Sequence, residues 1–332
     1  MNLAGRTALV TGAGGFVGSH LVEALVAAGV RVRAFVHYRA LRPEGWLDAL
    51  PAAARREVEV VPGDVRDAGA LLDAADGASV AFHLAALVGV PYSYVRPEAY
   101  VATNVTGTLH LLEAARRRAL ERVVVVSSSE VYGSARRLPI DEAHPLQAQS
   151  PYAASKLGGE KLAEAWARSF GLPVVVARPF NTYGPRQSAR AVIPAVAAQA
   201  LAGAREVRLG NLAPRRDFVH VRDTARALVA LAACDAAVGE VVNVATGEDH
   251  AIGDVAAAIV ERLAPGTPVV CDPARVRRAT SEVDCLRGDA SRLLALTGVR
   301  PAVAFRDGLA ETLAWYADPA HLARCRAPGY AV

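Results

Sequence analysis

A glycine-rich segment near the N-terminus constrains the fold of this chain more than any other feature. Gly12, Gly15 and Gly18 are spaced three residues apart, after a β-branched run at residues 7–10 and before a helix-like apolar run at residues 19–28. Glycines let the chain turn sharply, and they let backbone amides and the helix N-terminus approach a pyrophosphate. Because the glycines stand between a predicted strand and a predicted helix, they indicate a dinucleotide-binding βα turn rather than an ordinary glycine-rich loop.

Strand-like and helix-like runs alternate through the first half of the chain. Long helical patterns cover residues 101–118 and 152–170. Such alternation predicts a parallel sheet covered by helices on both faces, which is the doubly wound, Rossmann-type α/β fold. The predicted strands cover residues 7–10, 30–36, 58–61, 79–83, 122–127 and 174–178.

The pattern loosens after residue 178, where proline and glycine become more frequent and the predicted elements shorter. We therefore expect residues 1–178 to form a dinucleotide-binding domain and residues 179–332 to form a smaller substrate-binding lobe. Part of residues 219–245 is expected to pack back on the first domain.

Composition excludes several classes of function. The 332 residues are 52% hydrophobic and 21% charged, a globular balance, and the net charge of +4 is scattered without a dense Lys/Arg block, so we expect no nucleic-acid partner. The longest apolar stretch, residues 191–204, is shorter than a membrane span and contains a proline. No signal peptide is apparent, and the four cysteines are widely spaced, so we expect a cytoplasmic protein without membrane association, metal site or disulfide framework.

The end of the second predicted strand should hold the residue that reads the adenosine ribose of the dinucleotide. A carboxylate there favours NAD, whereas an arginine accommodates the 2′-phosphate of NADP. Residues 35–42 contain no acid, and Arg39 and Arg42 slightly favour NADP over NAD, although both also fit solvated loop charges. Asp64 follows the third predicted strand, where its carboxylate suits either an adenine amino group or a turn.

Two polar stretches carry the chemistry. Residues 127–130, Ser-Ser-Ser-Glu, leave the carboxyl end of the fifth predicted strand, and open α/β sheets bind ligands at that edge. Tyr152 and Lys156 are four residues apart at the start of a predicted helix and therefore share one face. An ammonium group beside a phenol favours the phenolate, so we expect Tyr152 to exchange a proton with a substrate alcohol while a serine hydroxyl holds the same oxygen.

The chain resembles a known protein family in the order of its motifs. Over residues 7 to about 316 it resembles the extended short-chain dehydrogenases/reductases, and within them the sugar-nucleotide epimerase/dehydratase branch. The matching motifs are the glycine turn, residues 83–86 (HLAA), 104–108 (NVTGT), the serine run, Tyr152 with Lys156, residues 178–181 (RPFN), and 216–218 (RDF) with Asp223.

The resemblance implies a tightly bound NAD or NADP that is regenerated in each turnover, and a homodimer formed through the helices at residues 101–118 and 152–170. It also implies two sets of binding residues. Those expected to bind the dinucleotide are Gly12, Gly15, Phe16, Val17, Gly18, His37, Arg39, Asp64, Val65, Leu84, Ala85, Ala86, Asn104, Tyr152 and Lys156. Those expected to bind a nucleotide sugar are Tyr94, Ser128, Asn181, Arg190, Arg216 and Arg277, with Arg277 preferred over Arg275 and Arg278.

Within the branch, the segment Ser128-Ser129-Glu130 separates the reactions. The resemblance implies that a glutamate at this place is typical of 4,6-dehydratases and UDP-glucuronate decarboxylases, whereas 4-epimerases usually have no acid there. Once C4 of the sugar is a ketone, the C5 proton becomes acidic and a carboxylate can remove it. The alternative is that Glu130 only orients other groups. dTDP-glucose dehydratases usually have an aspartate before this glutamate, so Ser129 leaves the acid that helps water depart undecided.

Longer stretches refine the resemblance. Residues 32–38, 45–48, 91–94 and 180–194 resemble UDP-N-acetylglucosamine 4,6-dehydratases of the legionaminic-acid pathway type, which usually have a threonine at the place of Ser128. We therefore expect an enzyme that converts UDP-N-acetylglucosamine, or a related nucleoside-diphosphate hexose, to the 4-keto-6-deoxy sugar. A UDP-glucuronate decarboxylase and a 4-epimerase are the alternatives among enzymes. A nucleotide-sensing regulator on this fold is the alternative outside them, and it would not need the tyrosine, the lysine and the serine hydroxyl together.

Overall fold

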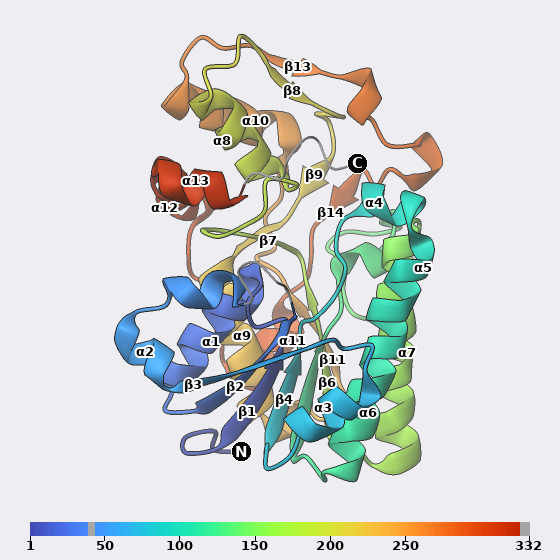
Figure 1. Cartoon of the computed structure of the whole chain (residues 1–332). Helices are drawn as coiled ribbons and strands as arrows, with labels where there is room; N and C mark the ends of the chain where they lie inside the picture. Colours follow the sequence, from blue (N-terminus) through green and yellow to red (C-terminus); the bar gives the residue numbers. More distant parts are fainter. Residues whose placement is uncertain (39–43, 326–332) are drawn as a thin grey trace.

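A seven-stranded parallel sheet forms the larger lobe of the computed structural model, which describes residues 1–38 and 44–325 (Figure 1). The strand order is β11-β6-β5-β4-β1-β2-β3, and each neighbouring pair is parallel. This arrangement confirms the predicted Rossmann-type α/β fold. The strands are β1 (Thr7–Thr11), β2 (Arg31–His37), β3 (Val58–Gly63), β4 (Val80–His83), β5 (Arg122–Val126), β6 (Val174–Pro179) and β11 (Val241–Val244).

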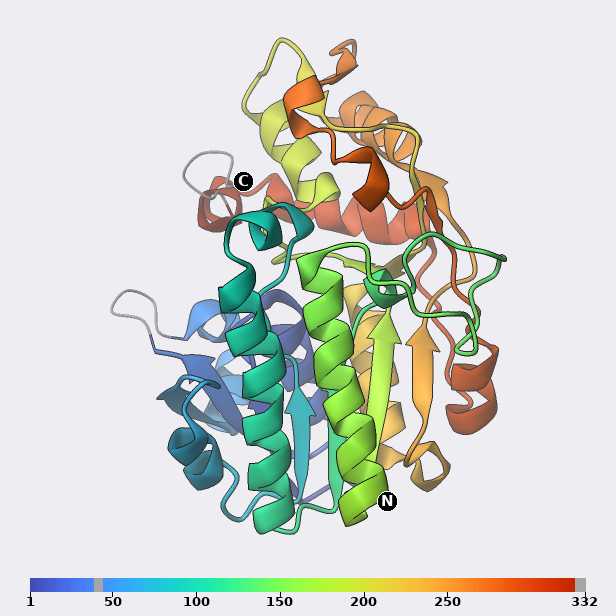
Figure 2. The same cartoon turned by 90° about the vertical axis from the view of Figure 1, so that its right-hand side faces the viewer.

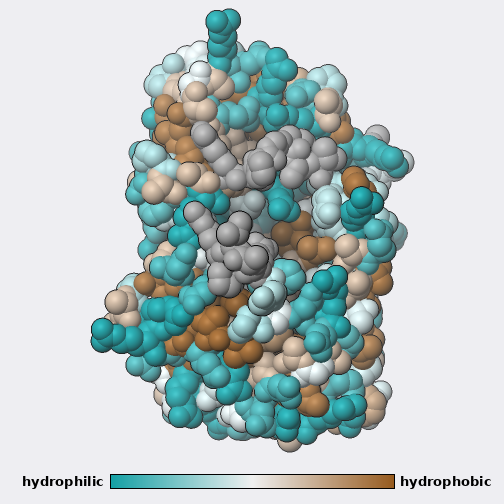
Figure 3. Space-filling model, viewed as in Figure 1, coloured by the Kyte–Doolittle hydropathy of each residue, from teal (hydrophilic) through white to brown (hydrophobic). Residues whose placement is uncertain are grey.

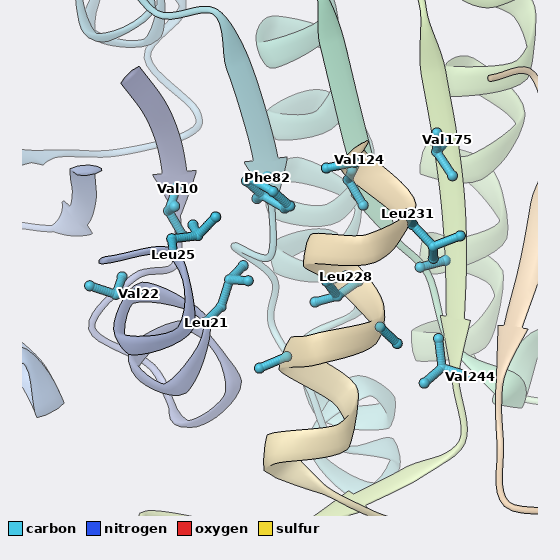
Figure 4. Packing of buried hydrophobic residues seen from close by; sticks show 14 of the residues in the cluster. Val10, Leu21, Val22, Leu25, Phe82, Val124, Val175, Leu228, Leu231 and Val244 are labelled. Atoms are coloured by element: carbon cyan, nitrogen blue, oxygen red, sulfur yellow. The ribbon is translucent and has the colours of Figure 1, made fainter. Parts of the chain in front are cut away.

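Helices cover both faces of this sheet. On one face lie α1 (Phe16–Ala27), α9 (Val221–Ala233) and α11 (Ser291–Thr297), and Figure 4 shows leucines of α1 and α9 against Val10, Phe82 and Val124 of the strands. On the other face lie α3 (Ala68–Ala74), α6 (Gly107–Arg117) and α7 (Pro151–Phe170), and Figure 2 shows α6 and α7 side by side. These two buried layers fix the carboxyl edge of the sheet, where the candidate site lies.

The helix expected over residues 101–118 has a wider turn at its start than the sequence predicts. The short helix α5 (Pro97–Tyr100) leads into a π-helical segment, η2 (Val101–Thr106), before α6 begins. The side chain of Asn104 in this segment accepts a hydrogen bond from Leu87 N (2.8 Å) and donates one to Leu87 O (3.0 Å). The π turn thus directs a buried amide toward the loop after β4, and π turns often occur at functional sites.

The smaller lobe lies above the carboxyl edge of the sheet in Figure 1 and has its own apolar core. Its helices are α8 (Val192–Leu201), α10 (Ile252–Leu263), α12 (Phe305–Tyr316) and α13 (Pro319–Cys325). Its strands, in three small sheets, are β7 (Asn181–Tyr183) with β10 (Phe218–His220), β8 (Val207–Leu209) with β13 (Val269–Cys271), and β9 (Arg215–Arg216) between β12 (His250–Ala251) and β14 (Cys285–Leu286). The remaining short helices are η1 (Gly45–Ala49), α2 (Ala52–Arg56), α4 (Val90–Val95), η3 (Ser129–Tyr132), η4 (Asp235–Ala237), η5 (Pro273–Arg275) and η6 (Ala279–Ser281).

The chain crosses between the two lobes more than once. Within residues 219–245, α9 packs against α1 and β11 extends the large sheet beside β6. Further along, α11 returns to the same face and packs against α9 and β11. Sequence patterns did not indicate this last return. We therefore propose that the substrate-binding lobe consists of the residues after 179 without α9, β11 and α11.

The surface of both lobes is mixed. Figure 3 shows hydrophilic side chains over most of the face seen in Figure 1, with hydrophobic patches between them. Of the helices that the structure describes, none combines the length and the apolar character needed to cross a membrane.

Candidate active site

The glycine turn between β1 and α1 is packed so closely that side chains would not fit. Gly12 has φ +71°, and a Cβ atom added to it would lie 2.8 Å from Ala85 N. A Cβ atom on Gly18 would lie 2.1 Å from Gly12 O. Gly15 is the N-cap of α1 and provides no side-chain acceptor for the amides of the first turn. A tight glycine turn that ends in a helix N-terminus without a side-chain cap fits the pyrophosphate of a dinucleotide.

We predict that Gly18→Ala weakens dinucleotide binding at least about tenfold and lowers the melting temperature. The added methyl would overlap a backbone oxygen, which cannot rotate away, so the turn must shift; overpacking of this kind costs about 1–3 kcal/mol. Calorimetric titration and thermal unfolding measure both effects. Gly69→Ala in α3 is the matched control, because the nearest atom to its added Cβ is a side-chain oxygen at 3.3 Å. Unchanged affinity in Gly18→Ala would contradict this prediction.

The other residues expected at the dinucleotide lie along the carboxyl edge of the sheet. Phe16 and Val17 open α1, His37 ends β2, Asp64 and Val65 follow β3, and residues 84–86 follow β4. The guanidinium of Arg66 holds the pKa of the Asp64 carboxyl below its usual range, with a smaller contribution from His37. Asp64 therefore stays ionised and can accept hydrogen bonds.

Arg39 and Arg42, on which the preference for NADP rests, both lie outside the described residues. Asn104 holds the loop after β4 through Leu87, and its amide also donates to Ser155 Oγ (2.9 Å). In this structure Asn104 acts on the loop beside the site, and Ser155 lies between Tyr152 and Lys156 on α7.

The serine run and the start of α7 meet at one point. The Ser128 side chain lies close enough to the Tyr152 phenol to lower its pKa, and Ser128 Oγ accepts a hydrogen bond from Glu130 N (3.2 Å). Lys156 Nζ donates to Val126 O, the last residue of β5 (2.6 Å). Two segments more than twenty residues apart thus place a phenol, a hydroxyl, a carboxylate and an ammonium together.

Local sequence explains both halves of this cluster. Helix α7 starts at Pro151, after an N-cap at Ser150 whose side chain accepts from Ala153 N (3.1 Å). At the other half, Ser128 is extended and caps the short helix η3, so the chain turns as soon as β5 ends. Ser129, the first residue of η3, is buried beside Ser128.

The charges at the cluster differ from the expectation. Burial raises the pKa of Tyr152 to about 12, and the nearby charge of Glu130 adds to the rise, while the Ser128 side chain opposes it. Burial lowers the pKa of Lys156 to about 8, against the attraction of Glu160. We expected Lys156 to lower the pKa of Tyr152. In this structure burial raises that pKa instead, and the Lys156 ammonium donates to the carbonyl of Val126.

Two buried histidines near the site are held as neutral structural groups. His83 lies between Thr11 Oγ1 (2.8 Å) and Thr108 Oγ1 (3.0 Å), and burial lowers its pKa to about 3. His220 is the N-cap of α9, and burial lowers its pKa to about 4. Within the described ranges no group of three or more His, Cys, Asp or Glu side chains is arranged to hold a metal ion.

A cleft of about 560 Å³ lies between the lobes, a size typical of small-molecule sites. Its walls come from residues 88–92 after β4, the segment from β7 to α8, the segment from the end of β8 to β10, and residues 275, 277 and 282. Four of the six residues predicted to bind a nucleotide sugar line it, namely Asn181, Arg190, Arg216 and Arg277. A fifth, Tyr94, lies beside residues 278–281, where its hydroxyl contacts Ser281 Oγ and Arg278 lies 5.8 Å from its ring.

The arginine side chains that line the cleft favour the binding of an anion. Arg216 is 5% exposed, and burial lowers its pKa, with Arg277 adding to the fall and Glu130 and Glu282 opposing it. Arg277 Nη1 is buried and has no hydrogen-bond partner among the described residues. Two guanidinium groups that line the same cleft, one with an unpaired buried donor, suit a diphosphate, which accepts charge-assisted hydrogen bonds.

Sequence reasoning missed several residues at the cleft. Glu282 lies 3.9 Å from Arg216 and brings a carboxylate into a cationic site, and Gln187 and Thr182 line the wall beside Asn181. Asp217 is fully buried and accepts hydrogen bonds from Thr246 and from the amides of residues 247 and 288, which fixes the strand that carries Arg216. For Thr182, Gln187 and Asp217, the sequence signal that could have found them was the resemblance of residues 180–194 and 216–218 to the family.

Comparison with known proteins finds relatives of this chain that share its architecture. A family model described as GDP-mannose 4,6-dehydratase matches residues 9–312. A dTDP-glucose 4,6-dehydratase of Actinoplanes sp. is 36% identical over 316 residues, which covers 93% of this chain and 97% of that protein. A solved dTDP-glucose 4,6-dehydratase of Streptomyces venezuelae with NAD bound is 32% identical, with a TM-score of 0.83 over 93% of this chain and 96% of that one.

Epimerases of similar architecture match almost as well. The UDP-glucose 4-epimerase of Thermus thermophilus, solved in complex with NAD, is 30% identical, with a TM-score of 0.83 over 94% of this chain and 99% of that one. Overall similarity therefore does not distinguish a dehydratase from an epimerase. The distinction must come from the side chains at the site.

Proposed function

This chain belongs to the GDP-mannose 4,6-dehydratase family, within the extended short-chain dehydrogenases/reductases that act on sugar nucleotides, and we propose that it is a nucleoside-diphosphate-hexose 4,6-dehydratase. One observation carries the proposal. Glu130 follows Ser128 in η3, its backbone N donates to Ser128 Oγ, and its charge raises the pKa of both Tyr152 and Arg216, so a carboxylate lies near the proton-transferring phenol and near the cleft. An epimerase has no use for a base at that place.

In the proposed reaction, Tyr152 accepts the proton of the C4 hydroxyl, and Ser128 holds the same oxygen. A nicotinamide dinucleotide held at the glycine turn would supply the hydride chemistry at C4 and C6. Glu130 removes the C5 proton, the electron pair forms the C5–C6 double bond, and the C6 hydroxyl leaves as water with one of the two protons now held by Tyr152 and Glu130. The other proton returns to C5, which leaves a 4-keto-6-deoxy sugar and an unchanged protein. Arg216, Arg277 and Asn181 bind the diphosphate.

We propose UDP-N-acetylglucosamine as the preferred substrate. Two features support it: residues 91–94 and 180–194 resemble the dehydratases that use this sugar, and parts of both segments line the cleft. Ser129 also stands where dTDP-glucose dehydratases usually have an aspartate. The similarity to the Actinoplanes protein favours dTDP-glucose instead, so the two sugar nucleotides are the first pair to compare.

Mass spectrometry of the products tests the proposal. The protein is incubated with UDP-N-acetylglucosamine, dTDP-glucose, GDP-mannose, UDP-glucose and UDP-glucuronate, each with NAD and with NADP. Loss of one water supports the dehydratase, loss of carbon dioxide indicates the decarboxylase, and an altered sugar of unchanged mass indicates the epimerase. Faster dehydration of dTDP-glucose than of UDP-N-acetylglucosamine would overturn the proposed substrate but keep the reaction.

We also predict a homodimer in which α6 and α7 of two copies pack as a four-helix interface, as the family resemblance implies. Closed two-fold pairs are the commonest oligomers, and Val101, in η2 just before α6, and Phe170, the last residue of α7, are 53% and 54% exposed. Light scattering at micromolar concentration should give twice the mass of 34.7 kDa. Val101→Glu should shift the protein toward monomer, because it places a charge in the apolar contact. A monomer mass for the unmodified protein would defeat this prediction.

A further inference from the structure

A short segment of the chain lies directly on the glycine turn. Trp46 N, in η1, donates a hydrogen bond to Gly14 O (2.9 Å). A Cβ atom on Gly14 would lie 2.6 Å from Glu44 O, and one on Gly45 would lie 2.3 Å from Gly14 O. The two backbones can approach this closely only because both positions are glycine. Movement of residues 44–48 must therefore move the turn that is expected to hold the dinucleotide.

The smaller lobe holds this segment through its last two helices. Arg324 of α13 donates from Nη2 to Gly45 O (2.9 Å) and to Asp48 Oδ1 (2.6 Å). Its guanidinium also lies 4.1 Å from the centroid of the Trp46 ring, within the range of a cation–π contact. Trp46 in turn packs edge to face on Trp315 of α12, with centroids 5.4 Å apart.

The same two helices hold the wall of the cleft. The Tyr316 hydroxyl donates to Gln187 O (2.5 Å), and Ala189 N donates to Cys325 O (3.3 Å). Gln187 and Ala189 line the cleft, and Arg190 follows them. Neighbouring residues of α12 and α13, 315 with 316 and 324 with 325, thus contact residues 45–48, which lie on the glycine turn, on one side and the wall of the cleft on the other.

We propose that Arg324 is a positioning residue that couples the two binding sites through α12 and α13. A nucleoside diphosphate in the cleft fixes residues 187–190, this fixes the two helices, and Arg324 then fixes residues 44–48 against Gly14. The identity of the two ligands rests on the proposed function. Coupling suits the proposed chemistry, because a hydride removed from C4 and returned to C6 requires both ligands to stay in place between the two transfers.

Coupling of this kind is reciprocal and is measured as a change in affinity. Calorimetry would give the affinity of the unmodified protein for its dinucleotide with and without saturating UDP, which lacks the sugar that would touch the dinucleotide directly. We expect UDP to tighten dinucleotide binding about fivefold or more, within the usual range of about 5–150-fold. In Arg324→Gln we expect a factor near one, with the affinity for UDP alone changed by less than about threefold.

Three further variants test whether the coupling depends on the contact between Arg324 and Asp48. Asp48→Asn removes the charge partner of Arg324 from the opposite side and should also reduce the coupling, so the test survives a poorly folded Arg324→Gln protein. Arg222→Gln breaks an exposed pair with Glu311 of α12 and should keep the coupling. Arg186→Gln removes a different link, from the same cleft segment to Glu23 of α1 (2.7 Å), and should also keep it.

The outcomes separate the two proposals. Full coupling in both Arg324→Gln and Asp48→Asn, no coupling in the unmodified protein, or loss of coupling in Arg186→Gln alone would overturn the role of Arg324. Absence of any NAD or NADP binding to the unmodified protein would overturn the proposed function itself.

Discussion

Tyr152→Phe is expected to lower turnover by about 10²–10⁴-fold, the usual cost of removing a positioned acid/base, while the protein still folds. The phenyl ring keeps its edge-to-face contact with Tyr100, at a centroid distance of 6.1 Å, and loses only the hydroxyl on the side of Ser128. Lys156 does not replace it, because its ammonium donates to the carbonyl of Val126. Product formation and thermal unfolding measure the two effects separately.

Tyr183→Phe is the matched control for this prediction. It also removes a buried phenol hydroxyl, which donates to Phe305 O (3.3 Å) in the smaller lobe. Loss of that bond should cost roughly 1 kcal/mol of stability and leave turnover near its normal rate. A normal rate in Tyr152→Phe would remove this tyrosine from the mechanism.

The large sheet was predictable where its strands are continuous apolar runs. Residues 122–126, Arg-Val-Val-Val-Val, show this pattern, which is expected of a parallel strand buried on both faces. β11 gave no such signal, because Asn243 interrupts its apolar run. In the structure this amide is fully buried, where it accepts from the Tyr132 hydroxyl and donates to Ile140 O, and only tertiary contacts reveal that it belongs to a strand.

The candidate site was likewise predictable where a local pattern encodes it and not where it depends on tertiary contacts. Tyr152 and Lys156 were predictable because their chemistry depends on a spacing within one helix. The raised pKa of Tyr152 was not, because burial is decided by packing between distant segments. The contact of Arg324 with Asp48 joins residues 276 positions apart, and two-residue strands such as β9 exist only through their pairing partners. No local sequence pattern encodes the contact between Arg324 and Asp48 or the strand β9.

Glu130→Gln is expected to stop elimination while oxidation at C4 continues. An amide cannot take up the C5 proton, so dehydration and C5 deuterium exchange in heavy water should fall by about 10²–10⁴-fold. Tyr152, Lys156 and Ser128 remain, and the hydrogen bond from residue 130 to Ser128 comes from the backbone, so the substitution does not remove it. Quenching with borodeuteride should therefore still trap a 4-keto sugar that retains its C6 hydroxyl, seen by mass spectrometry.

Glu130→Asp distinguishes a base from a structural group. Aspartate keeps a carboxylate on a shorter side chain, so it should restore part of the C5 exchange that the glutamine variant loses. If Glu130 only supported the fold, both variants would either dehydrate normally or lose every step together with stability. If the protein were an epimerase, C5 would not exchange even with Glu130 in place. Ready C5 exchange by Glu130→Gln would show that another group removes the proton, and the assignment of Glu130 as the base would fall.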